Sequence, residues 1–400
     1  MAIVSSRLDR INASQTLSVA ARTAELRRAG HDVINLGLGE LELPIPMHVR
    51  EAAARSSMQG SGASTPVPGT AALRHAIVEK LQRDQDLDYA DEEIIVGTGS
   101  KQVIFNAMMA TLEPGNEVII PAPYWVSYPD IVTMAGGKAV TVHTTFQQGF
   151  KLEAGALEKA ITKNTKWLVL NSPNNPSGAV YTREEIRQIG AVLARHPHVL
   201  LLSDEIYEHF VYDDAGPGSL AAQLPELKAR TLLVNGVSKS HAMIGWRVGY
   251  GAGPRELVAA MSKVQSQVTS GTCTVAQEAA VEALLGPQQS VAEVVGAIAT
   301  RRRVALEEIV RVPGLRCAPA DGAFYLFADC SDLIGKLTPD GATLRTDGDV
   351  ADYLLSGAGV AVVPGAAFGT SPYLRIAYVC DEARLRSAMG RMERALSALR

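Results

Sequence analysis

Cysteine is scarce in this chain of 400 residues, and the few that occur stand far apart. Their spacing contains no C-x-x-C pair, so it predicts neither a zinc site nor a disulfide framework. We therefore expect a reducing compartment and no bound metal. The four cysteines are Cys273, Cys317, Cys330 and Cys380.

Long apolar runs are also missing. No stretch approaches the ~20 apolar residues that a membrane-spanning helix needs, and residues 1–15 lack the apolar core of a signal peptide. The formal net charge of −4 gives no indication of a basic surface for nucleic acid. These absences predict a cytoplasmic protein that acts on small molecules and contacts neither membrane nor nucleic acid.

Short apolar runs, in contrast, recur along much of the chain. They are rich in Val, Ile and Leu, which is typical of strands buried on both faces. Segments with helical periodicity separate them, and Thr182 and Glu185 stand in capping-box spacing at the start of one. This alternation predicts an α/β fold with a largely parallel sheet covered by helices. The strand-like runs are 93–97, 117–121, 167–171, 199–203 and 231–235, and the helical segments are 100–112 and 182–196.

The pattern changes near residue 290. A long helical segment, 291–310, is followed by strand-like segments at 322–330 and 372–379. A chain of this length is too long for one ordinary core, so we expect two domains. The predicted parts are an N-terminal segment at 1–45 that joins the small domain, a large domain at 46–290, and a small α+β domain at 291–400.

Polar residues follow the strand-like runs at the points where the strands end. Ligands of open α/β sheets bind outside the carboxyl ends of the strands, so residues from distant parts of the sequence are expected to converge on one site. These residues are Gly97 to Gly99, Asn171 to Asn175, Asp204, and Ser238 with Lys239.

Lys239 and Arg247 lie in the segment NGVSKSHAMIGWRVGY, between two strand-like runs. An isolated lysine is usually an exposed surface residue. A lysine in a partly desolvated pocket beside a cation loses proton affinity, however, and becomes a nucleophile that forms a Schiff base with a carbonyl. Arg247 would supply that cation and would also suit a bidentate contact with a phosphate.

The segment GTGSKQ suggests a second contact with an anion. Gly97 and Gly99 follow a strand, and Ser100 would open a helix whose free N–H groups attract an anion. A tight turn between strand and helix explains the same glycines equally well. The dinucleotide fingerprint G-x-G-x-x-G is incomplete, because its sixth position is Gln102, so NAD is disfavoured.

Asp204 and Tyr207 follow the fourth run in the segment SDEIYEHF. An isolated aspartate at such a place is more often a helix cap. A buried carboxylate opposite a pyridine nitrogen would instead keep that nitrogen protonated, and Tyr207 would suit a phenolate oxygen on the same ring. Asn175, held between two prolines, would suit that oxygen too. Trp125 is either a core residue or a surface on which an aromatic ring stacks.

Together these motifs resemble those of the class I aminotransferases of fold type I, and more narrowly the bacterial aspartate aminotransferase-like subgroup. The resemblance covers nearly the whole chain and includes GTGSKQ, PAPYWVSYP, NSPNNPSGAVY, SDEIYEHF, DGAFY and YLRIAYV. It implies a mostly parallel seven-stranded sheet, pyridoxal 5'-phosphate as cofactor, and homodimers with composite active sites. The expected reaction moves an amino group between an L-amino acid and a 2-oxo acid.

The resemblance also implies a role for each candidate residue. Lys239 would hold the cofactor as an aldimine and then act as general base and acid, while Asp204 would pair with the ring nitrogen. Asn175 and Tyr207 would contact the ring oxygen, and Trp125 would stack on the ring beside the substrate. The phosphate would meet Gly99, Ser100, the backbone of Lys101, Ser238 and Arg247. The substrate α-carboxylate would meet Arg375, Asn175 and the backbone of Gly39.

Four places depart from the family pattern. The stretch Leu41-Glu42-Leu43 stands where relatives usually have Pro-Asp-Phe beside the substrate, and Ser64 stands where they have a tyrosine that reaches the neighbouring subunit's phosphate. Asn12 replaces a lysine that some aspartate- and prephenate-using relatives carry for the distal carboxylate, and Ile244 replaces a common threonine. These changes weaken the expectation of an aspartate preference.

Two interpretations of these departures stay open. One is drift within an ordinary aminotransferase. The other is a pyridoxal-phosphate enzyme that diverts the same carbanion to elimination, replacement or carbon–carbon bond formation.

Overall fold

In the computed structural model, which describes residues 3–60 and 62–400, seven strands form the main sheet in the order β2-β8-β7-β6-β5-β3-β4. Neighbouring strands run parallel except β8, which is antiparallel to both β2 and β7. The predicted α/β fold with a mostly parallel seven-stranded sheet is thereby confirmed. The strands are β2 (Ile94–Gly97), β3 (Glu117–Ala122), β4 (Lys138–His143), β5 (Thr165–Asn171), β6 (Leu200–Asp204), β7 (Thr231–Gly236) and β8 (Gly249–Ala252).

The five predicted apolar runs all form strands of this sheet, which are β2, β3, β5, β6 and β7. Their side chains alternate between two faces, so that Val118 and Ile120 pack into one apolar cluster and Ile119 packs into another. Both faces are covered, which explains why the runs are apolar except at their ends. The edge strand β4 was not predicted, because its end residues are exposed and its middle is only half-buried.

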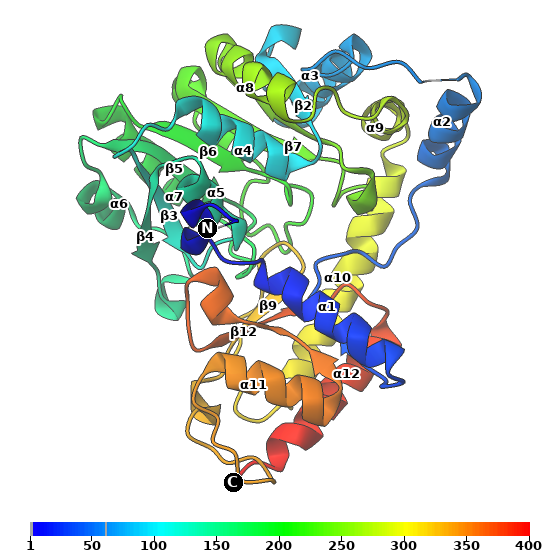
Figure 1. Cartoon of the computed structure of the whole chain (residues 1–400), viewed down its shortest axis with the longest axis vertical. Helices are drawn as coiled ribbons and strands as arrows, with labels where there is room; N and C mark the ends of the chain where they lie inside the picture. Colours follow the sequence, from blue (N-terminus) through cyan, green and yellow to red (C-terminus); the bar gives the residue numbers. More distant parts are fainter. Residues whose placement is uncertain (1–2, 61) are drawn as a thin grey trace.

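Helices cover both faces of the main sheet (Figure 1). One face carries α4, α5 and α8, and the other carries α3, α6, α7 and α9, with α2 packed on α9. The predicted helices correspond to α4 and α7, and the capping box forms, since Glu185 N donates to Thr182 Oγ1 and Thr182 N donates to Glu185 Oε2. The bounds are α2 (Met47–Met58), α3 (Ala71–Gln85), α4 (Ser100–Thr111), α5 (Ser127–Met134), α6 (Ala154–Ala160), α7 (Arg183–Arg195), α8 (Arg255–Val268) and α9 (Thr274–Leu285).

A second part of the structure is built around an antiparallel sheet of three strands in the order β11-β12-β9. The long helix α10 runs into this part and packs against α12 (Figure 1). The predicted helix at 291–310 and strands at 322–330 and 372–379 correspond to α10, β9 and β12. The bounds are α10 (Gln289–Ile309), β9 (Tyr325–Asp329), α11 (Asp347–Tyr353), β10 (Val360–Ala361), β11 (Val363–Pro364), β12 (Tyr373–Ala377) and α12 (Glu382–Ser397).

The N-terminal segment lies against this second part. Its strand β1 (Ile34–Asn35) pairs in parallel with β10, and α1 (Gln15–Arg28) runs beside the same part in Figure 1. Ile34 and Leu36 share an apolar cluster with residues of β9, β12 and α12. The domain limits at 45/46 and 290/291 stay a prediction. Among the described residues, no helix has the length and apolar character that crossing a membrane requires.

Candidate active site

A cavity of about 300 Å³ opens at the carboxyl ends of β5, β6 and β7, beside the first turn of α4. The second part of the structure contributes Tyr325 and Arg375 to its wall, and the N-terminal segment contributes residues 38–40. Every site residue predicted from the sequence lines this cavity except Gly99, which packs directly behind Arg247. Segments far apart in the chain therefore do converge, as the positions of the strand ends predict.

Lys239 enters the cavity from the loop after β7. Its Nζ donates a hydrogen bond to the carbonyl of Gly39 at 2.8 Å and lies 5.5 Å from the ring centre of Phe324. Burial lowers the pKa of Lys239 to about 8. The charges of Arg375 and Arg247 lower it further, against an opposing effect of Glu40 and Asp204. A substantial fraction of the amine is therefore unprotonated, and nucleophilic, at mildly alkaline pH.

Asp204 ends β6 with its carboxylate buried in the wall of the cavity. Tyr128 OH donates to Oδ2 at 2.6 Å, and the backbone N–H of Ile206 donates to Oδ1 at 3.3 Å. Burial raises the pKa of Asp204 to about 6, although these donors and the Lys239 charge oppose the rise. No helix follows Asp204, so the helix-cap interpretation is wrong. The carboxylate is mostly ionised at neutral pH and faces a cavity.

The other end of the cavity is suited to an anion. Ser100 begins α4, whose first N–H groups have no partner within the helix, and Arg247 lies beside this helix start. A Cβ on Gly99 would come within 2.2 Å of Arg247 Nη2, and Gly99 has φ +83°, so only glycine fits there. The guanidinium is also held by the Ile244 carbonyl, at 3.0 Å from Nη1. Ser238 is buried nearby in the same wall.

Trp125 is partly buried, lines the cavity and also packs against the apolar cluster on one face of the main sheet. Tyr128 packs edge-on against it, with ring centres 5.2 Å apart, and Lys101 Nζ lies 4.9 Å from its ring centre. The described residues offer Lys101 Nζ no hydrogen bond and no ion pair. Burial and the charge of Arg247 lower the pKa of Lys101. An aromatic surface and a second amine thus face the same cavity.

Arg375 lies on β12 and is 2% exposed. Its Nη1 donates to Asn175 Oδ1 at 2.9 Å and its Nη2 to the Gly37 carbonyl at 2.6 Å. Within residues 3–60 and 62–400, no carboxylate pairs with this guanidinium, and its Nε lacks a hydrogen-bond partner. A buried cation that lacks a counter-ion is strongly biased towards binding an anionic ligand.

Tyr207 joins the two parts of the structure beside this arginine. Its hydroxyl lies 2.9 Å from that of Tyr325, whose ring stacks 4.6 Å from the Arg375 guanidinium carbon. A Cβ on Gly39 would come within 2.0 Å of the Tyr325 hydroxyl, so glycine is required where the N-terminal segment crosses the cavity. Gly39 therefore presents only its backbone to the cavity, and its contact with the substrate carboxylate stays a prediction.

Sequence reasoning missed Tyr128 and Tyr325 as members of the site, and it gave Asn171 a place there but no contact. Asn171 Nδ2 donates to the carbonyl of Asp204, and its Oδ1 accepts from the backbone N–H of Asn175, both at 2.9 Å. All three lie inside segments that carry the family resemblance. The hydrogen-bond partners of the two tyrosines are distant in the chain, 76 residues away for Tyr128 and 118 for Tyr325. No local sequence pattern therefore indicates these contacts.

The departures from the family pattern mostly lie outside the cavity of this chain. Leu41 belongs to the core of the second part, Glu42 forms an ion pair with Arg384, and neither lines the cavity. Ser64 is exposed and also lies outside it. Asn12 donates its backbone N–H to Asp130, while Ile244 does line the cavity.

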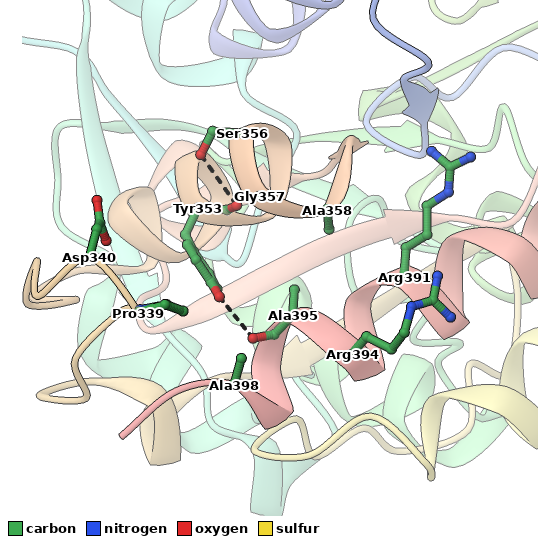
Figure 2. A pocket seen from close by; sticks show the side chains of 10 residues that line it. All are labelled: Pro339, Asp340, Tyr353, Ser356, Gly357, Ala358, Arg391, Arg394, Ala395 and Ala398. Atoms are coloured by element: carbon green, nitrogen blue, oxygen red, sulfur yellow. Dashed lines mark hydrogen bonds between the residues drawn. The ribbon is translucent and has the colours of Figure 1, made fainter.

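A second hollow, of about 710 Å³, lies between α11 and α12 (Figure 2). It is an open surface groove, and none of the residues predicted for the site lines it. Arg391 at its edge is paired with Asp32. No group of three or more potential metal ligands occurs among the described residues. The cavity around Lys239 is therefore the candidate active site.

The residues of this cavity fit the predicted cofactor, pyridoxal 5'-phosphate. A helix start and a guanidinium lie at one end for a phosphate, a buried carboxylate lies in the wall for a ring nitrogen, and a nucleophilic amine lies within reach of both. Arg375 and the Lys101 amine have no anionic partner among the described residues and could bind a second anion. This donor set suits a cofactor phosphate together with an acidic substrate.

Comparison with known proteins places these observations in a family. Residues 31–392 match the family model described as aminotransferase class I and II. The chain is 48% identical over 394 residues to an aspartate aminotransferase of Rhizobium meliloti (strain 1021), covering 98% of this chain and 96% of the relative. It is 46% identical over 399 residues to a probable aspartate/prephenate aminotransferase of Rickettsia felis, covering 100% and 98%.

Solved structures agree with the sequence relatives. The aspartate aminotransferase from Rhizobium meliloti superposes with a TM-score of 0.96 at 48% identity, over 100% of both chains. The aspartate aminotransferase from Thermus thermophilus with maleate gives a TM-score of 0.92 at 40% identity, over 99% of this chain and 100% of that one.

Proposed function

Because this chain belongs to the class I and II aminotransferases, we propose that the cavity around Lys239 is its active site. The family resemblance, the pyridoxal phosphate dependence and the transfer of an amino group between an amino acid and a 2-oxo acid are confirmed by this membership. The observation that carries the site assignment is the placement of Lys239, Asp204 and Arg375 around one cavity. Elimination, replacement and carbon–carbon bond formation have no support in the names of the relatives.

The cofactor, when bound, supplies an aldehyde for the Lys239 amine and an aromatic ring that withdraws electrons. Arg247, Ser100, Ser238 and the first N–H groups of α4 would hold its phosphate. Asp204 would pair with the ring nitrogen, and Trp125 would cover one face of the ring. Asn175 Nδ2 and Tyr207 OH would meet the ring oxygen.

The Lys239 amine would move a proton to and from the substrate α-carbon. Its lowered pKa, about 8, lets the same group accept and return a proton near neutral pH. Arg375 would bind the substrate α-carboxylate through its planar fork, and Asn175 Oδ1 already holds that fork in place at 2.9 Å.

The amino donor that we propose is a dicarboxylic amino acid, aspartate being the substrate named for several relatives. Two observations support this class. Arg375 provides one buried cation without a counter-ion, and Lys101 provides a second cation in the cavity wall, 4.9 Å from the ring centre of Trp125. Lys101 would meet the distal carboxylate, a role compatible with the loss of lysine at Asn12.

Replacing Lys101 tests both this assignment and the proposed function. In Lys101→Met, kcat/KM for amino transfer from aspartate to 2-oxoglutarate is expected to fall about 10- to 100-fold, the value of one charge-assisted hydrogen bond. Transfer from a monocarboxylic donor such as phenylalanine should change little. Lys138→Met, which removes an exposed lysine paired with Glu117, serves as the control. Absence of any amino transfer by the parent enzyme would contradict the function, whereas equal losses for both donors would contradict only the role of Lys101.

We also propose a cytoplasmic homodimer with composite sites and with domains at the limits predicted above. Two exposed residues support a second subunit that covers the cavity. Arg247 is exposed although it would bind the cofactor phosphate, and Leu17 is 64% exposed although it lines the cavity. Sedimentation at micromolar concentration is expected to give twice the chain mass of 42.5 kDa. A fully active species at the mass of one chain would rule this assembly out.

A further inference from the structure

Tyr128 connects two residues that the proposed function places against the cofactor. It is 3% exposed, and its hydroxyl donates to Asp204 Oδ2 at 2.6 Å. Its ring meets that of Trp125 edge-on, with planes at 81° and centres 5.2 Å apart. The backbone N–H of Tyr128 donates to the Trp125 carbonyl at 3.1 Å, so the start of α5 holds the two rings at a set separation.

The carboxylate of Asp204 has few donors besides this hydroxyl. Within residues 3–60 and 62–400, the only other hydrogen bond to it comes from the Ile206 N–H, at 3.3 Å. The titratable groups facing it are Lys239 from the loop after β7, Tyr207 from the turn after β6, and Tyr128 from α5. Asn171, at the end of β5, binds the Asp204 backbone carbonyl and not the carboxylate.

These contacts determine how easily Asp204 keeps its charge. Burial raises the pKa of this carboxyl to about 6, and the Tyr128 donor is the first of the influences that hold it down. A donor to a carboxylate favours the ionised form, so losing the donor raises the pKa further. The carboxylate would then be protonated over a wider part of the neutral range.

We propose that Tyr128 is a positioning residue that sets the lower pH limit at which Asp204 can act on the cofactor, while its ring orients Trp125. This inference rests on the roles that the proposed function gives to Asp204 and Trp125. Tyr128 itself acts through them.

Tyr128→Phe separates the hydroxyl from the ring, because phenylalanine keeps the edge-on contact with Trp125. Cofactor is removed, and the dissociation constant of pyridoxal phosphate is measured by equilibrium dialysis across pH for parent and variant. The acid midpoint of the affinity profile is expected to rise by about one pH unit, which corresponds to a loss of about 1.4 kcal/mol of preference for the charged form. The acid limb of kcat/KM should move the same way.

Tyr353→Phe is the control variant. It removes a hydroxyl that donates to the Ala395 carbonyl at 2.9 Å, in the hollow between α11 and α12 and away from the catalytic cavity (Figure 2). Its affinity profile should superimpose on that of the parent. Replacement of Tyr128 by 3-fluorotyrosine supplies the opposite test, since a more acidic phenol is a stronger donor and should lower the midpoint. The 3-fluorotyrosine protein also tests the role of the Tyr128 hydroxyl if Tyr128→Phe fails to fold.

The outcomes distinguish Tyr128 from the proposed function. An unchanged acid midpoint in both Tyr128 forms would overturn the inference. Asp204→Asn is measured in the same assay, because its profile should lose the step near pH 6 that Asp204 contributes while keeping the fall below about pH 8 that Lys239 contributes. If Asp204→Asn keeps that step, the role of Asp204 itself fails. If Asp204→Asn loses it while the Tyr128 forms stay at the parent midpoint, only the role of Tyr128 fails.

Discussion

Lys239→Ala is expected to lose amino transfer by at least about 10³-fold, because it removes the group that bonds the cofactor and also the proposed acid and base at the α-carbon. No other lysine that lines the cavity stands where it could take over the role of Lys239. Lys101 is the other lysine lining the cavity, but its amine lies over Trp125 rather than beside Gly39 and Phe324. Pyridoxal phosphate should still bind to the variant, since Arg247, Asp204 and the start of α4 are intact.

Borohydride reduction followed by peptide mapping checks this assignment directly. Trypsin cannot cut after a modified lysine, so the label should appear on an uncut peptide that spans 231–247. The Lys239→Ala protein should carry no label after the same treatment. A label on Lys101, or on any lysine outside this peptide, would refute the assignment. Lys138→Ala, an exposed lysine paired with Glu117, controls for nonspecific loss of charge.

The pH dependence of cofactor capture provides a second readout for the same residue. The amine must lose its proton before it attacks an aldehyde, and burial lowers its pKa to about 8. Capture by cofactor-free protein is expected to rise about tenfold per pH unit below that value and to level off above it. A profile that keeps rising towards the ordinary lysine range would contradict the burial of this amine.

The main sheet was readable from the sequence because its central strands are buried on both faces. Runs such as 167–171 and 231–235 are apolar except at their ends for that reason, and the helices between them keep a 3.6-residue period. The edge strand β4 mixes polar and apolar residues at half-buried positions, so its sequence carries no comparable signal. Strand β8 was not among the predicted runs either, although it is fully buried, because its sequence GYGA is rich in glycine.

The site residues could be predicted for a different reason, because they stand at strand ends in recognisable motifs. Lys239, Asp204 and Arg247 all line one cavity, as their positions implied. What the motifs omit is how these residues are held. The contacts of Tyr128 with Asp204 and of Tyr325 with Tyr207 join segments 76 and 118 residues apart, which only the fold brings together.

For the stretch Leu41-Glu42-Leu43, the motif suggested a place in the site that the structure of this chain does not show. From its sequence position it was expected to flank the substrate, but the chain turns away after Glu40. Leu41 then enters the core of the second part, and Glu42 pairs with Arg384. Neither residue therefore lines the cavity of its own chain.

Asp204→Asn is expected to retain cofactor but to lose kcat by about 10²-fold or more, since the amide cannot stabilise a protonated ring nitrogen and a neutral pyridine withdraws electrons less well. The replacement is close to isosteric. Tyr128 OH can still donate to the amide oxygen, and the Ile206 contact is a backbone one, so packing around the site should persist. The loss should therefore appear in kcat more than in KM for the amino acid, which Arg375 and Lys101 would bind.

The neighbouring residue provides a matched control. Glu205 is also a buried carboxylate, with its pKa raised by burial to about 7, but it bonds Ser203 and the N–H of Ala221 and does not line the cavity. Glu205→Gln therefore removes a buried charge one position away without touching the cofactor. It should keep near-normal kcat, even if its unfolding temperature falls as much as that of Asp204→Asn.

Equal loss of kcat in the two variants would mean that burial of charge at the end of β6, and not contact with the ring nitrogen, explains the importance of Asp204. Near-normal turnover by Asp204→Asn would contradict its role outright.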